Sequence, residues 1–346
     1  MSPKKKRKCV DWANASFDHF LLKVSYVGTN YLGNAYQIDV PTVEGALFEA
    51  CTKANMIEDR TKCAFSRCGR TDKGVHGRGN YVSMDLRLRP GKGDEPAEPY
   101  DYHAMLNRML PNDIRILSLH RVPTSFDARF NCLYRVYRYF FWATPDLDLD
   151  RMEKAAQLFV GEHDFRNICK MDLENTRNHR RRIMAPVAFS HSSGSGTNGS
   201  PIVHVTIKGL SFLYHQIRCM MSILFMIGRG HEEPSVITEL LDVKKNPRKP
   251  VYDLADPSGL VLWDCCFEGV YQDEGQRDET CLDSFFNMYQ HSVKMSAIFA
   301  AMGDIAPGAH PKPNTSRHQP LWERATAPSL EEKLVLLGEV VPEDDE

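Results

Sequence analysis

The segment Ser66–Gly77 (SRCGRTDKGVHG) gathers residues that could do chemistry into one short stretch. It holds a single carboxylate, Asp72, among several cationic side chains, and three glycines loosen the backbone around it. The pattern admits four interpretations: an ordinary polar turn, a phosphate cradle, a metal site, or a nucleophile held where a polyanion binds.

Local chemistry separates these interpretations. A phosphate-binding loop is excluded because the pair Gly69 and Gly74 is not followed by the Lys-Ser/Thr that such loops need. A metal site is disfavoured because Asp72 and His76 lie among cations that repel another positive ion. An ionised carboxylate remains, favoured by its cationic neighbours and suited to act as a nucleophile or base. Taken alone, the segment still fits a salt-bridged surface turn more simply.

The segment Tyr134–Tyr139 (YRVYRY) is typical of a β-strand. Because side chains alternate along a strand, Arg135, Tyr137 and Tyr139 share one face. Aromatic and arginine side chains on a sheet can stack nucleobases and bind phosphates. The alternative, which the local pattern favours, is a core strand whose tyrosines are buried.

The segment Phe212–Met221 has helical apolar spacing, which places Tyr214 and Arg218 one turn apart on one face. Arg218 lies just before a continuous apolar run. An unpaired buried charge is costly, so we expect a carboxylate partner for this arginine. The alternative is a helix-end arginine that reaches solvent.

The chain of 346 residues is 42% hydrophobic and 25% charged, which is typical of a globular protein. Its net charge of −2 hides a basic run at Pro3–Lys8 and an acidic end at Glu343–Glu346. The basic run predicts a nuclear-import signal or a nucleic-acid-binding arm, so we expect a nuclear protein that can also be cytoplasmic. Basic clusters predicted to bind phosphates are Arg87, Arg89 and Lys92; Arg177, Arg180, Arg181 and Arg182; and Lys244, Lys245, Arg248 and Lys249.

The ten cysteines are scattered and include no Cys-x-x-Cys pair. Their spacing indicates neither a zinc ribbon nor a disulfide framework, so we expect no metal site and buried thiols in a reducing compartment. The longest apolar run, Cys219–Ile227, is too short to span a membrane, and no secretory signal begins the chain. These features predict a soluble, intracellular protein without membrane contact.

Apolar periodicity predicts an α+β fold in which strand and helix runs occur twice, as two similar halves that each have a sheet covered by helices. The expected domains are a basic arm (1–14), an N-terminal half (15–125), a C-terminal half (126–270) and a helical extension with an acidic tail (271–346). Strands are expected at 20–27, 80–86, 113–121, 133–142, 182–190, 202–210 and 259–270, and helices at 42–54, 102–109, 150–160, 212–227 and 281–302.

The stretch from Cys68 to His76 (CGRTDKGVH) resembles the signature of the TruA-type tRNA pseudouridine synthases. The resemblance extends over roughly residues 20 to 270. Its further motifs, in the family's order, are Tyr26-x-Gly28-x-x-Tyr31-x-Gly33, Asn107-Arg108-x-Leu110-Pro111-x-Asp113-Ile114, Phe126-x-Ala128-Arg129-Phe130, Arg135-x-Tyr137-Arg138-Tyr139, Gly161-x-His163-Asp164-Phe165 and Phe212-x-x-His215-x-x-Arg218.

The resemblance implies the pseudouridine synthase fold, with an active-site cleft between the two halves. It also implies a reaction in which uridine is detached at N1, turned and rejoined at C5, without metal or cofactor. Asp72 matches the catalytic aspartate, Tyr137 the tyrosine that packs against the target base, and Arg218 the basic residue that pairs with the aspartate. The family's enzymes act as homodimers, with the tRNA across both subunits.

The resemblance also suggests substrate-binding residues. Arg70 matches the arginine that helps to displace the target base from the RNA stem, and His76 and Arg78 lie close enough in sequence to contact RNA. Two positions depart from the family pattern: Asn34 replaces an aromatic residue and Asn80 replaces a glutamine. Both lie outside the proposed catalytic set, so we expect them to alter substrate fit.

The stretches HDFRNICKMD (163–172) and KNPRKP (245–250) resemble most the eukaryotic branch that modifies tRNA positions 38 and 39, in the anticodon arm. Two alternatives remain open: the branch acting at positions such as 27 and 28, and a tRNA-binding protein that has lost activity. A hydrolase using Asp72 is disfavoured, since no paired acid or metal ligands accompany that residue.

Overall fold

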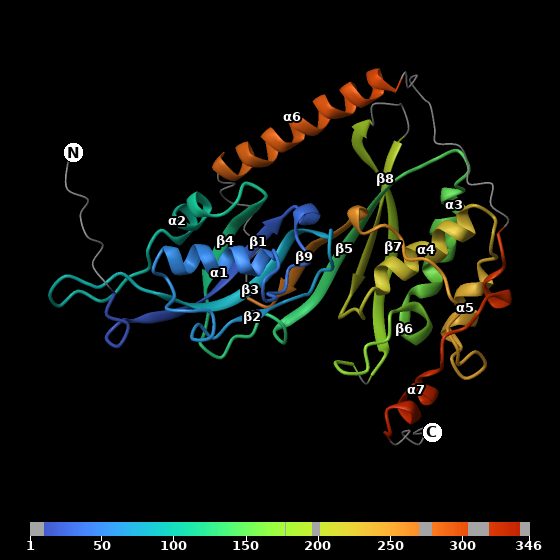
Figure 1. Cartoon of the computed structure of the whole chain (residues 1–346), viewed down its shortest axis with the longest axis horizontal. Helices are drawn as coiled ribbons and strands as arrows, with labels where there is room; N and C mark the ends of the chain where they lie inside the picture. Colours follow the sequence, from blue (N-terminus) through green and yellow to red (C-terminus); the bar gives the residue numbers. More distant parts are fainter. Residues whose placement is uncertain (1–9, 177, 196–200, 270–278, 304–317, 340–346) are drawn as a thin grey trace. The chain divides into compact units, whose positions relative to one another are not determined.

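The computed structural model describes residues 10–176, 178–195, 201–269, 279–303 and 318–339. Within these residues it has mixed helices and antiparallel strands, which confirms the predicted α+β class (Figure 1). The chain forms two compact units: unit 1 comprises Met1–Leu133 and Leu262–Ser292, and unit 2 comprises Tyr134–Val261 and Val293–Glu346. The basic run at Pro3–Lys8 and the acidic end at Glu343–Glu346 lie outside the described residues.

Unit 1 is built on a sheet with the strand order β4-β1-β3-β9, and the short β2 also pairs with β3. Strand β1 is antiparallel to both β3 and β4, so it lies at the centre of this sheet. The strands are β1 (Phe17–Tyr26), β2 (Ser66–Arg67), β3 (His76–Arg87), β4 (Ile114–Arg121) and β9 (Leu260–Phe267).

The helices of unit 1 cover this sheet through one apolar core. Leu22 and Met84 from the strands, and Leu47 and Leu106 from the helices, are each no more than 1% exposed. Thr42 caps the first helix by accepting a hydrogen bond from Gly45 N at 3.1 Å. The helical elements are η1 (Gly28–Asn30), α1 (Val43–Lys53), α2 (Tyr102–Met109) and the first part of α6 (Glu279–Met302).

Unit 2 has its own antiparallel strands in the order β5-β8-β7-β6. Its longest helix, α4, packs on β5 through edge contacts of Phe225 with Tyr139 and Phe141. The strands are β5 (Cys132–Trp142), β6 (Gly161–Asp164), β7 (Arg180–Ser195) and β8 (Pro201–Gly209). The first two residues of β5, Cys132 and Leu133, belong to unit 1. The helical elements are α3 (Leu149–Ala156), η2 (Gln157–Phe159), η3 (Arg166–Ile168), α4 (Gln216–Gly228), α5 (Ser235–Leu241), η4 (Pro257–Gly259), η5 (Leu321–Glu323) and α7 (Leu330–Leu336).

The start of α4 corrects one sequence prediction. The helix begins at Gln216 rather than at residue 212, because His215 adopts a left-handed backbone conformation (φ 60°) that cannot continue into a helix. Gln216 closes the preceding turn, since its Oε1 accepts a hydrogen bond from Leu213 N at 2.8 Å. Tyr214 therefore lies in a loop, and it does not share a helix face with Arg218.

The C-terminal segment 318–339 belongs to unit 2 and is attached to it by polar contacts. Trp322 Nε1 donates to Glu239 Oε2 at 2.6 Å, and Arg166 Nη1 donates to Glu331 Oε1 at 2.6 Å. Leu321 is completely buried. Among the helices that the structure describes, none is both long enough and apolar enough to cross a membrane.

Candidate active site

The signature loop connects β2 to β3 in unit 1. Its first residue is held as an extension of the sheet, because Cys68 N donates to Tyr81 O at 2.8 Å. Its end is a tight turn in which Val75 N donates to Asp72 O at 3.1 Å. Gly74 has φ 79°, a conformation that a residue with a side chain rarely adopts, so glycine is required there.

Two asparagine side chains bind the same backbone carbonyl in this loop. Asn34 Nδ2 donates to Gly69 O at 2.9 Å, and Asn80 Nδ2 donates to it at 3.0 Å. Asn34 also accepts from Thr71 N at 2.7 Å through its Oδ1, and both asparagines are 2% exposed. These are the two departures from the family pattern, which the sequence assigned to substrate fit. The structure instead gives them a place in the support of the signature loop.

The motif Tyr26-x-Gly28-x-x-Tyr31-x-Gly33 also packs against the loop. Tyr26 Oη hydrogen-bonds Thr71 Oγ1 at 2.8 Å, and Tyr31 O accepts from Gly74 N at 3.4 Å. A Cβ atom on Gly28 would lie 2.0 Å from Val75 O, so only glycine allows this close approach. The motif and the signature therefore occur together because they form one packed unit.

A third motif extends this support to β4. Asp113 Oδ1 accepts a hydrogen bond from Tyr31 Oη at 2.7 Å, and Asp113 O accepts from Val27 N at 2.9 Å. Asn107 joins α2 to β4 through both of its amide atoms, which hydrogen-bond the backbone of Ile116 at 2.8 and 3.0 Å. The loop thus connects through hydrogen bonds to the sheet edge.

The predicted residues of unit 1 occupy distinct positions around this loop. Asp72 is partly buried, whereas Arg70 is exposed. His76 accepts a hydrogen bond from Gly28 N through Nδ1 at 3.1 Å, which leaves Nε2 as the proton-bearing nitrogen of the neutral ring. The Arg78 guanidinium stacks on the Trp263 ring, 4.6 Å from its centroid. His76 therefore contributes to loop support, and Arg78 presents a cation beside an aromatic ring.

In unit 2, Tyr137 lies on β5 opposite Ile207 of β8. It is 9% exposed, and its ring meets the edge of the Phe212 ring at 5.0 Å. Tyr139, on the same strand face, donates its hydroxyl hydrogen to Asp256 O at 2.9 Å. Burial raises the pKa of Tyr139 to about 12, so this phenol stays neutral. Tyr137 therefore lies between Arg135 and Tyr139 on one face of β5.

Arg218 lies in the first turn of α4, as the third residue of the helix. Its Nε donates to Ala255 O at 2.7 Å, and Ala255 N donates to Arg218 O at 3.3 Å. Its positive charge also helps to hold the pKa of Asp256 below its usual value, after the larger effect of hydrogen bonds from Ser258. The segment 255–256 therefore contacts both Arg218 and Tyr139 and brings their elements together within unit 2.

Several members of the predicted phosphate-binding clusters contact other residues of the chain, some of them while staying exposed. Arg89 pairs with Glu98, and Lys249 Nζ donates to Cys169 O at 2.8 Å. The two stretches that resemble the eukaryotic 38/39 branch thus pack together through Lys249 and Cys169. Cations that remain exposed include Lys92, Lys244 and Lys245. Arg177 lies outside the described residues.

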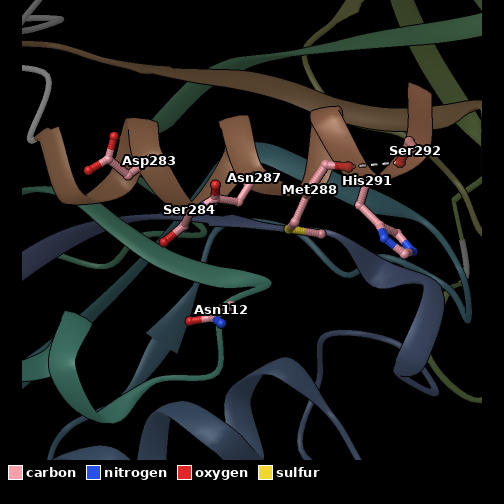
Figure 2. Close-up of a pocket in the computed structure, with 7 residues that line it drawn as sticks. All are labelled: Asn112, Asp283, Ser284, Asn287, Met288, His291 and Ser292. Atoms are coloured by element: carbon pink, nitrogen blue, oxygen red, sulfur yellow. Dashed lines mark hydrogen bonds between the residues drawn. The ribbon is translucent and has the colours of Figure 1, made fainter. Parts of the chain in front are cut away.

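Unit 1 also contains a pocket of about 380 Å³ beneath α6 (Figure 2). Ser284, Met288 and His291 on the helix line it together with Asn112 from the turn before β4. Arg115, which is 5% exposed, anchors this helix by donating to Ser284 Oγ at 2.8 Å. The pocket contains none of the predicted site residues.

The two amide hydrogen bonds to Gly69 O predict that substitutions of Asn34 and Asn80 have non-additive effects on stability. Asn34→Ala should lower the free energy of unfolding by about 1–3 kcal/mol, because it leaves the buried Thr71 amide without its acceptor. The double variant Asn34→Ala/Asn80→Ala should lose more than the sum of the single losses, because only then does Gly69 O lose both donors. Urea unfolding measures each value, and the exposed Asn14→Ala is the control. Additive losses would contradict the shared support.

The lowered pKa of His215 predicts that the stability of the folded chain depends on pH. Burial, followed by the charges of Arg218, Lys170 and Lys249, lowers the pKa of His215 from 6.5 to about 4. The unfolded chain therefore binds a proton below pH 6.5 while the folded chain does not. Stability contributed by neutral His215 is present above pH 6.5 and is lost as the pH falls towards 4.

His215→Asn removes this titration and keeps a residue that tolerates a left-handed conformation. Urea unfolding at a series of pH values should show a shallower acid loss of stability in the variant than in the wild type. Parallel curves for the two proteins would show that His215 does not contribute.

Comparison with known proteins identifies the family of this chain. A family model described as tRNA pseudouridine synthase matches residues 155–268. Over 320 residues the chain is 44% identical to the human tRNA pseudouridine(38/39) synthase, covering 86% of this chain and 66% of that protein, so it spans about two thirds of the relative's length. It is 35% identical to the Saccharomyces cerevisiae protein of the same name, with coverages of 90% and 72%. It is 34% identical to tRNA pseudouridine synthase A of Methanothermobacter thermautotrophicus, with coverages of 82% and 94%. The chain therefore belongs to the tRNA pseudouridine synthase family.

Proposed function

We propose that this chain converts uridine to pseudouridine in tRNA, at positions 38 and 39 of the anticodon stem-loop. The observation that carries the proposal is the support of the signature loop. Asn34 and Asn80 bind Gly69, Tyr26 and Asn34 bind Thr71, and the Tyr31 backbone binds Gly74, so the supported residues lie on both sides of Asp72 in the sequence. A surface turn would not need such support. The names of the relatives, tRNA pseudouridine(38/39) synthase, supply the position.

The proposed reaction is an isomerisation that needs no oxidant or second substrate. The bond between the sugar C1′ and N1 of uracil breaks, a bond from C1′ to C5 forms, and the proton at C5 is lost while N1 gains one. Asp72 acts as the nucleophile on the sugar or the base, or as the base that removes a sugar proton. A carboxylate on a rigid loop is pre-oriented for each of these roles.

The remaining residues have supporting roles in the proposal. Tyr137, packed edge-on against Phe212, offers a flat surface to the target uracil. Arg218 supplies the positive charge that favours an ionised carboxylate in the proposed reaction. Exposed Arg70 takes the place of the displaced base in the stem, and His76 and Arg78 contact the RNA near the loop. Asp72 belongs to unit 1, and Tyr137 and Arg218 belong to unit 2.

Release of tritium from uridine C5 tests the nucleophile, because forming the new carbon–carbon bond expels that label. Wild type should release tritium from tRNA labelled in the anticodon arm. Asp72→Asn should still bind this tRNA, but its rate of release should be lower by at least about three orders of magnitude. The exposed Asp94→Asn is the matched control and should behave as wild type. Equal release by Asp72→Asn would remove Asp72 from the catalytic role.

The same assay resolves the target position when each tRNA carries labelled uridine at one site only. Labelled uridine at position 38 or 39 should be a substrate, and uridine at 27 or 28 should not. Tritium release only from uridine at position 27 or 28 would assign the chain to the branch that modifies those positions. Binding of tRNA without release from any position by the wild type would instead identify a binding protein.

We also propose that the chain acts as a homodimer. Helix α6 presents Phe286, Tyr289 and Val293 to solvent at 55%, 65% and 44% exposure, an apolar row that a second copy could cover. Sedimentation equilibrium should give twice the chain mass at micromolar concentration. A single-chain mass across the accessible concentration range would contradict the proposal.

A further inference from the structure

Three cysteines that are far apart in the sequence meet inside unit 1. Cys68 precedes the signature glycine, Cys132 is the first residue of β5, and Cys265 lies on β9. Their sulfur atoms all lie within 4.8 Å of one another, and the residues are 4%, 9% and 2% exposed. Within the described part of the chain, this is the one group of three or more potential metal ligands whose ligand atoms lie this close together.

The spacing of these sulfurs matches one bound ion. Three thiolates that each lie about 2.3 Å from an ion at the centre of their triangle are about 4.0 Å apart. Sulfurs within 4.8 Å therefore need to move inward by less than about 1 Å to coordinate a metal. A disulfide would need a much larger approach, to about 2.05 Å, and would leave the third thiol over.

We propose that Cys68, Cys132 and Cys265 form a structural site for one thiophilic divalent cation of the zinc and cadmium class. Thiolate sulfur is a soft ligand that selects such ions over magnesium or calcium. Three thiolates around a divalent ion leave a single net negative charge, whereas a monovalent ion would leave two and cost more to bury. The site is separate from the proposed chemistry and does not depend on it.

Without an ion the Cys265 thiol is neutral. Burial, followed by hydrogen bonds with the Cys132 and Cys68 thiols, raises the pKa of the Cys265 thiol well above its ordinary value. Binding therefore releases the thiol protons to solvent, and affinity rises with pH. Cys132 is the least covered of the three and offers the route of entry.

A bound ion would join three separate parts of unit 1. Cys68 is bonded to Gly69, the residue whose carbonyl receives both asparagine amides. Coordination would tie this residue to the start of β5 and to β9, and it would restrict the loop that ends at His76. The expected effect is a higher resistance of the folded chain to unfolding, since the ion binds the folded state only.

The test is a titration of the full-length, reduced, metal-free chain with Cd²⁺ alone. One equivalent should produce the ultraviolet thiolate-to-cadmium charge-transfer band and raise the thermal midpoint, and Zn²⁺ should displace the cadmium. Cys265→Ser should weaken Cd²⁺ binding more than about tenfold, because it removes a direct ligand. If Cys265→Ser folds poorly, Cys132→Ser, at the first residue of β5, is the second variant and should weaken Cd²⁺ binding by a similar factor.

Cys266→Ser is the matched control. Cys266 is the next residue on β9, so its side chain points to the opposite face of the strand, and it is more exposed. This variant should keep the cadmium band and the rise in thermal midpoint. Absence of the band in the wild type, or an equal band in Cys265→Ser and Cys132→Ser, would overturn the proposal and leave the cluster as core packing.

Discussion

The hydrogen bonding of one carbonyl, Gly69 O, organises the proposed catalytic loop. Two buried amides reach it from different elements, Asn34 after η1 and Asn80 on β3. A backbone carbonyl can accept two hydrogen bonds, and both donors here are shielded from water. Because both sites of the carbonyl are used, the loop has little freedom to change its path before Asp72.

This support explains why motifs that are distant in the sequence occur together. Gly28 must lack a side chain because the loop backbone lies against it, and Tyr31 connects the loop to Asp113 beyond α2. The motif residues Tyr26, Gly28 and Tyr31 therefore act directly on the loop, and Asp113 acts on it through Tyr31. In the proposed reaction the chemistry is done by a few side chains, foremost Asp72.

Unit 2 prepares its residues by a different means. Tyr137 is oriented by strand pairing and by the Phe212 ring, while Arg218 is oriented by the carbonyl of Ala255. Both depend on a well-packed apolar core beneath β5 and α4, in which Met220, Met221 and Leu224 are completely buried. The left-handed His215 delays the start of α4 and thereby sets Arg218 in its first turn, where the chain approaches the segment 255–256.

The sequence by itself determined the fold class, most elements and the candidate residues. Period-two and helical spacing located β1, α1, α2, β4 and β5 to within a few residues, because burial of one face imposes that periodicity. It placed the start of α4 too early, since apolar residues at 212 and 213 match a helix and a single positive φ leaves no mark in apolar spacing.

Only the tertiary structure decided how distant residues converge. The sequence predicted only that the two asparagines alter substrate fit, and their common acceptor appears only when η1 and β3 flank the loop. The cysteines at 68, 132 and 265 follow no metal-binding spacing, yet strand pairing brings their sulfurs together. The physical reason is the same in both cases: local periodicity records which face of an element is buried, whereas the partner across that face is chosen by packing between elements far apart in the chain.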